Sequence, residues 1–138
     1  MPTYFVDRDL GRYDFANVLR EAGLEVEVHD DHFSPDTPDE DWVREVASRG
    51  WVVVTGDKAI LRTRLEMVAI RESRALVLVV IGRKAPVSEL AQNFVNTQGR
   101  IQRFLETAEP PAIAKIYRPG PRERPGSPGR VKPFPLRA

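Results

Sequence analysis

The chain has 138 residues, the usual size of one domain, and it contains no cysteine. The lack of cysteine excludes disulfides, thiol nucleophiles, iron–sulfur clusters and cysteine-built zinc sites. The longest apolar run, residues 75–82, is far shorter than the ~20 residues that span a bilayer, and the first residues lack the basic-then-apolar pattern of a signal peptide. We therefore expect a cytoplasmic protein with no membrane segment.

Charge is distributed unevenly behind a formal net value of +1. Residues 118–138 carry six Arg and Lys against one acid, Glu123, whereas the chain before them carries 15 basic and 19 acidic residues. An acidic body argues against nucleic-acid binding through bulk charge alone, because such binding scales with the phosphates neutralised. Nucleic-acid chemistry would therefore depend on local features, with the tail adding flexible counter-charges.

Predicted strands and helices alternate from the start of the chain. Residues 4–6 form a short apolar strand, and residues 15–22 place apolar side chains at helical spacing. Gly23 follows where a left-handed C-terminal cap favours a residue without Cβ. Apolar and polar side chains then alternate over residues 24–28, which is typical of a strand with one face in water. We place this strand near an edge of the sheet.

A second helix is predicted over residues 38–49, because Thr37 can cap it and Glu40, three residues later, can complete a capping box. Residues 51–54 form a continuous apolar strand of the kind buried on both faces of a parallel sheet, and Asp57 follows shortly after it.

The second half of the chain continues the alternation. A third helix is predicted over residues 61–69, and the most apolar strand, residues 75–81, should be central. Residues 86–107 read as one long helix, and residues 112–117 form the last strand.

This order predicts an α/β fold in three layers, with a mostly parallel sheet flanked by helices on both faces. We assign it to one domain, residues 1–117. Residues 118–138 hold six Pro and three Gly with little apolar periodicity, so this basic tail is expected to be disordered.

Carboxylates gather where the predicted strands end. Asp7, Asp9 and Asp57 all follow apolar strands, and in open parallel sheets functional residues collect at the carboxyl ends of the strands. One such aspartate is explained by its preference for turns. Several at one edge favour a shared cation.

The first turn of the second helix adds further candidates. Asp39 precedes Trp42 and Val43 at helical spacing and should lie along the buried face, whereas Asp41 should face water. Asp39 is therefore the preferred ligand and Glu40 the second choice, although acids in a first turn also complement the helix dipole.

Oxygen ligands without cysteine or a clear histidine pair suit Mg²⁺ or Mn²⁺ better than Zn²⁺. Such ions can activate water and neutralise charge on a phosphodiester. Lys58 and Arg8 lie beside the acids and could contact phosphate, or could be ordinary surface charges. The segment His29-Asp30-Asp31-His32 has the composition of a metal site, but it lies in a polar connection and is not our preferred site.

Three segments together resemble the PIN-like nucleases, especially the compact branch that includes VapC-type toxins. They are Phe5-Val6-Asp7, Asp39 with Trp42, and residues 50–58, whose Thr-Gly-Asp-Lys end is the most specific part. The likeness spans about residues 3–117. It implies a five-stranded sheet of order 3-2-1-4-5, a Mg²⁺ or Mn²⁺ site, endoribonuclease activity and often a partner antitoxin, as in VapBC-type toxin–antitoxin systems.

Carried onto this sequence, the resemblance assigns catalysis and metal binding to Asp7, Asp39 and Asp57. Many PIN domains have a fourth acid further along the chain. No aspartate follows Asp57 here, and the next glutamate, Glu66, lies inside a predicted helix. Either Asp9 or Glu40 completes the site, or the site has three acids.

Two other functions compete with a nuclease that cuts RNA. Asp7 and Asp9 also fit the nucleophile pair of haloacid-dehalogenase-type phosphatases, but that family needs a paired acidic motif late in the chain, which is missing. The second alternative is a catalytically inactive PIN-like module that binds RNA or a partner protein. A homodimer is compatible with each of these functions.

Overall fold

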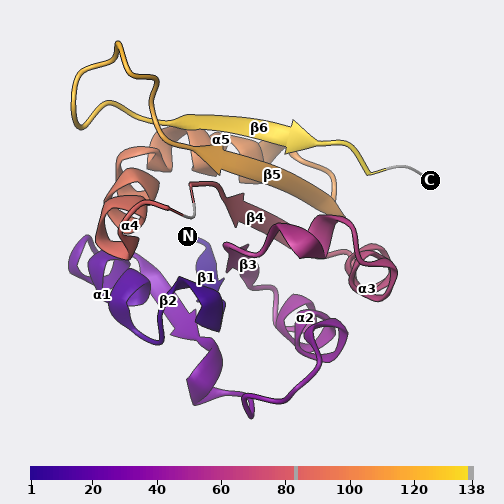
Figure 1. The fold of residues 1–138 in the computed structure, drawn as a ribbon. Helices are drawn as coiled ribbons and strands as arrows, with labels where there is room; N and C mark the ends of the chain where they lie inside the picture. The colour runs from indigo at the N-terminus through magenta and orange to yellow at the C-terminus, as the bar shows by residue number, and fades with distance from the viewer. Residues whose placement is uncertain (83, 137–138) are drawn as a thin grey trace.

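The computed structural model describes residues 1–82 and 84–136 (Figure 1). Its regular elements follow in the order β1 (Thr3–Val6), α1 (Asp14–Glu21), β2 (Glu25–Val28), α2 (Asp39–Ser48), β3 (Val52–Thr55), α3 (Arg64–Ser73), β4 (Leu76–Val80), α4 (Val87–Asn96), α5 (Gln98–Thr107), β5 (Ala112–Tyr117) and β6 (Arg130–Phe134). Three short 3₁₀ turns lie between them, η1 (Arg8–Leu10), η2 (His29–Asp31) and η3 (Lys58–Leu61). None of the described helices is both long and apolar enough to cross a membrane.

The strands form one sheet of order β2-β1-β3-β4-β5-β6, in which the first five strands are parallel and β6 runs antiparallel to β5. The α/β class and the mostly parallel sheet are confirmed, and β2 and β4 occupy the edge and central positions expected of them. The sheet has six strands rather than five.

The implied order 3-2-1-4-5 is wrong for this chain. Tyr4 of β1 pairs with Val26 of β2 on one side and with Val52 of β3 on the other, so β1 lies between them. The connection through α2 carries the chain across β1 before β3 begins. Strand order therefore reverses between β1 and β3, the position where open α/β sheets bind their ligands.

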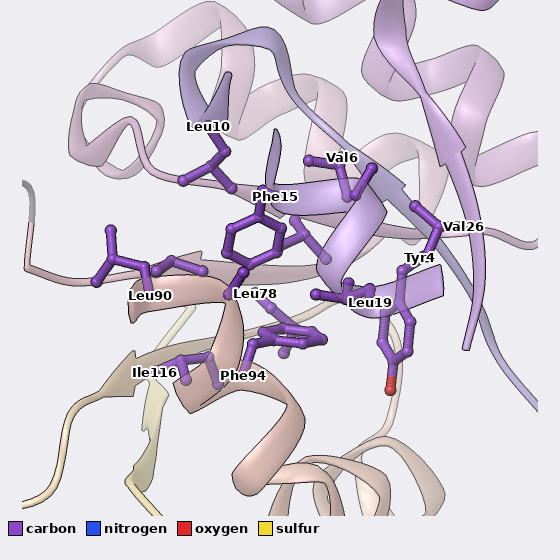
Figure 2. Close-up of a cluster of buried hydrophobic side chains, with 14 of the residues drawn as sticks. Tyr4, Val6, Leu10, Phe15, Leu19, Val26, Leu78, Leu90, Phe94 and Ile116 are labelled. Carbon is purple, nitrogen blue, oxygen red and sulfur yellow. The ribbon is translucent and has the colours of Figure 1, made fainter. Parts of the chain in front are cut away.

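Helices cover both faces of the sheet. Against one face, α1, α4 and α5 bury a cluster that includes Ile101 and also Phe15 and Phe94, which Figure 2 shows. The Phe94 ring lies 5.1 Å from that of Tyr4 and 5.6 Å from that of Phe15, in edge-to-face contacts. The other face is covered by α2 and α3. The sheet and the helices on its two faces form the three predicted layers.

Two local expectations about helices are wrong. The long helix over residues 86–107 is broken at Thr97, which ends α4 and precedes α5. The Thr97 hydroxyl donates to the Asn93 carbonyl at 2.6 Å and accepts from the Gly129 amide at 2.8 Å, so a tail residue uses the break. The capping box also does not form, because Pro38 is the N-cap of α2 and the structure shows no side-chain cap there.

The tail departs from the expected disorder, because residues 130–134 form β6. In Figure 1 this strand runs alongside β5 at the outer edge of the sheet, with α5 behind both. The tail offered little periodicity because, among its described residues, Val131, Phe134 and Leu136 alone pack against the two apolar clusters. Backbone pairing with the otherwise free edge of β5 is the further interaction that orders residues 130–134.

Candidate active site

Two aspartates come together where β1 and β3 end. The Val6–Val54 pair joins these strands, and the Asp7 amide donates to the Val54 carbonyl at 2.9 Å, which extends the ladder by one residue. Asp57 follows β3 and caps η3, with its Oδ1 accepting from the Ala59 amide at 2.9 Å. Both carboxylates thus lie at the reversal of strand order.

Thr55 links these acids through its fully buried side chain. Its hydroxyl donates to Asp7 Oδ2 at 2.9 Å and accepts from the Asp57 amide at 3.1 Å. Asp9 lies on the same side, with Oδ1 3.4 Å from the hydroxyl and 3.2 Å from the Gly56 amide. The sequence signal for this role of Thr55 is a polar residue at the end of an otherwise apolar strand.

The pKa of Asp7 reflects both the burial of this carboxylate and the negative charge around it. Burial and the nearby charge of Asp9 raise the pKa of Asp7 to about 7, and the charge of Asp39 adds to the rise. Hydrogen bonds from the Thr55 hydroxyl and the Arg8 amide only partly oppose it. Without a cation, the folded protein therefore disfavours the charged form of Asp7, first through burial and then through repulsion by Asp9 and Asp39.

Asp39 enters from the first turn of α2. Its Oδ1 accepts a hydrogen bond from the indole Nε1 of Trp42 at 2.9 Å, which fixes the carboxylate against a side chain that is only 1% exposed. The predicted orientation along the buried face of the helix is thus observed, and Asp41 on the other side is exposed. The charge of Asp39 acts on Asp7 and also on Glu66.

Glu66 was not among the ligands predicted from the sequence, because it lies within a helix. It is in α3, three and four residues before the buried Ala69 and Ile70, so it shares their inward face. Burial raises the pKa of Glu66, and Asp39 and Asp57 raise it further. Its Oε2 is buried without a hydrogen-bond partner among the described residues. An acid on the apolar stripe of α3 was the available signal.

Other sequence candidates take different positions. Glu40 is half-buried beside Asp39, but the charges that raise the pKa of Asp7 and Glu66 come from other acids. Lys58 is exposed next to Asp57. Arg8 instead pairs with Asp30, with its Nε 2.7 Å from Asp30 Oδ1.

The His29–His32 segment is used for packing. His29 is 3% exposed among the rings of Phe5, Phe33 and Trp42, and burial lowers its pKa. His32 Nε2 contacts Glu27 Oε1 at 2.6 Å. Neither imidazole joins the carboxylates at the ends of β1 and β3.

The donor set fits a hard divalent cation. Asp7, Asp39, Asp57 and Glu66 offer only carboxylate oxygens, and two of these acids have raised pKa values. Asp39 interacts with both Asp7 and Glu66 and so connects the two halves of the group. In the side-chain positions shown, no three potential ligands among the described residues are close enough to hold one ion. The case for a cation therefore depends on the chemistry of these carboxylate donors and on Glu66 Oε2, for which the described residues provide no hydrogen-bond partner.

The chain, whose acids lie where the strand order of the sheet reverses, can be assigned to a known protein family. The family described as "PIN like domain" matches residues 2–82, more than half of the chain, and the chain belongs to it. The chain is also similar to the protein named "Putative ribonuclease VapC45" from Mycobacterium tuberculosis (strain ATCC 25618 / H37Rv). The two are 24% identical over 123 residues, which cover 81% of this chain and 89% of that protein. The resemblance to PIN-like and VapC-type proteins is thus confirmed. All four acids lie within the matched segment, and β5 and β6 lie beyond it.

Proposed function

We propose that the chain is a metal-dependent endoribonuclease and the toxin of a VapBC-type toxin–antitoxin pair. The observation that carries the proposal is the buried Oε2 of Glu66, which has no hydrogen-bond partner in residues 1–82 and 84–136 and lies beside Asp39 and Asp57, at the edge where Asp7 also lies. A buried carboxylate oxygen without a donor is costly unless a cation or a proton occupies it.

The residues have separable roles in this proposal. Asp7, Asp39, Asp57 and Glu66 would hold Mg²⁺ or Mn²⁺, with Glu66 in place of the fourth acid that Asp9 or Glu40 was expected to supply. When bound, the cation activates water and neutralises charge on the scissile phosphate. Thr55 and Trp42 orient Asp7 and Asp39 through their hydrogen bonds, and Lys58 contacts substrate phosphate.

The test is cleavage of a fluorogenic single-stranded RNA with Mn²⁺, with Mg²⁺ and with EDTA. We expect turnover with either metal, none in EDTA, and none for Glu66→Gln or Asp57→Asn. Glu72→Gln is the matched control on α3, since the Glu72 side chain is 62% exposed and forms a surface ion pair with Arg44. Undiminished cleavage in EDTA would refute the metal mechanism.

A second function is favoured by the absence of three converged ligands among the described residues. The chain would then be a PIN-like module that binds RNA or protein without cutting. RNA binding without turnover at any Mn²⁺ concentration would establish it.

The toxin assignment is based on the similarity to VapC45. It predicts a partner protein and a cytoplasmic site of action. Expression of the chain alone should arrest growth, and co-expression of the product of an adjacent small reading frame should relieve the arrest. Light scattering of the purified chain tests the homodimer.

A further inference from the structure

The paired strands β5 and β6 present a row of basic and aromatic side chains on one face. In the antiparallel register, Lys115 lies opposite Lys132 and Tyr117 lies opposite Arg130. Residues directly opposite each other in a ladder share a face, as do alternate residues along a strand. These four residues form what we call the basic strand face.

Like charges placed opposite each other destabilise a sheet unless something compensates them. Lys132 Nζ lies 5.7 Å from the ring centre of Tyr117, and the Arg130 guanidinium lies 5.3 Å from the same ring. Lys115 Nζ lies 5.2 Å from the Phe134 ring. Within residues 1–82 and 84–136, none of the three cations has an ion-pair partner. The face keeps its positive charge and offers aromatic surface beside it.

These cations are held in position by the residue that precedes β6. Gly129 donates its amide to Thr97 Oγ1 at 2.8 Å, and its carbonyl accepts from Arg100 at 2.7 Å. A Cβ at Gly129 would lie 1.9 Å from the Tyr117 carbonyl oxygen, so only glycine allows this approach. On the opposite face of β6, Val131 packs against the apolar cluster, which leaves Arg130 and Lys132 in solvent. Residues 130–134 of the tail thus form an anchored strand, whereas a flexible polycation was expected from the composition.

The basic strand face lies on the side of the sheet that α2 and α3 cover, where the candidate active site also lies. Ile113 and Phe134 share its side of the sheet, and both pack in the cluster beneath α2 and α3, the helices that carry Asp39 and Glu66. Tyr117 is the last residue of β5, so it lies at the same carboxyl edge as Asp7 and Asp57. Two strand spacings separate β5 from β3, roughly 10 Å.

We propose that the basic strand face binds the single-stranded RNA that the acidic site cuts. This inference rests on the proposed function and adds its substrate-binding surface. Lys115, Arg130 and Lys132 contact successive phosphates, and an unpaired base stacks on Tyr117 or on the Arg130 guanidinium. Cations interleaved with an aromatic ring on an open strand surface are suited to single strands, because unpaired bases can reach a stacking surface. RNA binding needs such a surface because the residues before 118 carry more acidic than basic side chains and repel phosphate.

Binding is tested on the full chain in EDTA, where metal-dependent cleavage does not interfere. Fluorescence anisotropy of a labelled single-stranded RNA of mixed sequence gives Kd over a series of salt concentrations. Arg130→Gln with Lys132→Gln should raise Kd about tenfold or more at low salt and reduce the salt slope by about 1.4, since each phosphate contact on a single strand contributes ~0.7. Tyr117→Leu should weaken binding about fivefold or more with little change in salt slope.

The matched control is Arg122→Gln with Arg124→Gln, which removes the same charge from exposed positions in the loop before β6. Equal weakening by both double variants would overturn the proposal in favour of a non-positioned polycation. Unchanged RNA binding in the Arg130/Lys132 variant would also overturn it and favour an acidic protein partner for this face. Melting temperatures within a few degrees of the wild type verify that the variants fold.

The outcome separates this inference from the proposed function. If the wild type never cleaves RNA with Mn²⁺ but its binding depends on Arg130 and Lys132, the nuclease proposal fails and the binding surface stands. If cleavage occurs and kcat/KM is unchanged in the Arg130/Lys132 variant, the nuclease stands and the binding surface fails.

Discussion

Replacing Asp7 by asparagine should stabilise the metal-free protein at alkaline pH. The folded protein raises the pKa of Asp7 from 3.8 to about 7. Between these two values the folded state holds a proton that the unfolded state has lost, so the free energy of unfolding falls as the pH rises through this window. The penalty is fully present above about pH 7 and absent below about pH 4.

The size of the effect follows from the same shift. Three pKa units at 1.36 kcal/mol each set an upper limit of about 4 kcal/mol. Burial contributes the largest part of this shift, and the part due to Asp9 and Asp39 is shared among the three acids, so we expect Asp7→Asn to raise the free energy of unfolding at pH 8 by about 1 to 3 kcal/mol. Asparagine can still accept the hydrogen bond of the Arg8 amide, and the Thr55 hydroxyl can rotate to accept from its NH₂ group.

Urea unfolding in EDTA at intervals from pH 5 to pH 8 measures this difference. The variant and the wild type should have similar stability at pH 5 and diverge as the pH rises. Asp41→Asn removes an exposed acid from the first turn of α2 and should leave the wild-type pH slope intact. If wild type and Asp7→Asn lose stability in parallel from pH 5 to pH 8, the electrostatic account of this site is wrong.

Three other substitutions test further contacts of the site and of β6. Asp57→Asn should keep its cap on η3, melt in EDTA within a few degrees of the wild type, and lose most of the stabilisation by added Mn²⁺; an equal metal-induced shift in calorimetry would count against a shared site. Asp39→Ala should cost about 1 to 3 kcal/mol even in EDTA because the buried Trp42 indole loses its acceptor, whereas Asp39→Asn should cost less than 1 kcal/mol; equal losses in urea titrations would show that the indole bond does not matter. Gly129→Ala should cost about 1 to 3 kcal/mol and increase hydrogen exchange in β6, because its methyl group meets the Tyr117 carbonyl; protection equal to wild type would contradict this.

Features that depend on local pattern were predictable from the sequence. Apolar runs bounded by turn residues located β1, β3 and β4, and the strand ends then placed Asp7 and Asp57 at one edge. Asp39 followed from its helical spacing to the buried Trp42. The assignment of these acids as metal ligands stays a prediction.

Features that depend on distant contacts were missed. The strand order required knowing that the chain crosses β1 between β2 and β3, and local periodicity carries no such information. The break at Thr97 depends on Gly129, 32 residues away in sequence, and β6 forms by pairing with an edge that the sequence alone cannot locate. Glu66 was not a predicted ligand because it lies inside a predicted helix, and only the packing of α3 against α2 brings it toward Asp39.

The hydrogen bond from Trp42 to Asp39 provides the protein with an intrinsic optical probe. Of the two tryptophans, Trp42 is buried with its indole N–H on a candidate ligand, whereas Trp51 is half-buried and lies beneath the Arg49 guanidinium, whose carbon is 5.0 Å from the ring centre. A change in the charge on the Asp39 carboxylate alters the field along the indole N–H and should shift the emission of Trp42 more than that of Trp51. Trp51→Phe would isolate this signal, so that cation occupancy could be followed by fluorescence in unlabelled protein and without any nucleic acid.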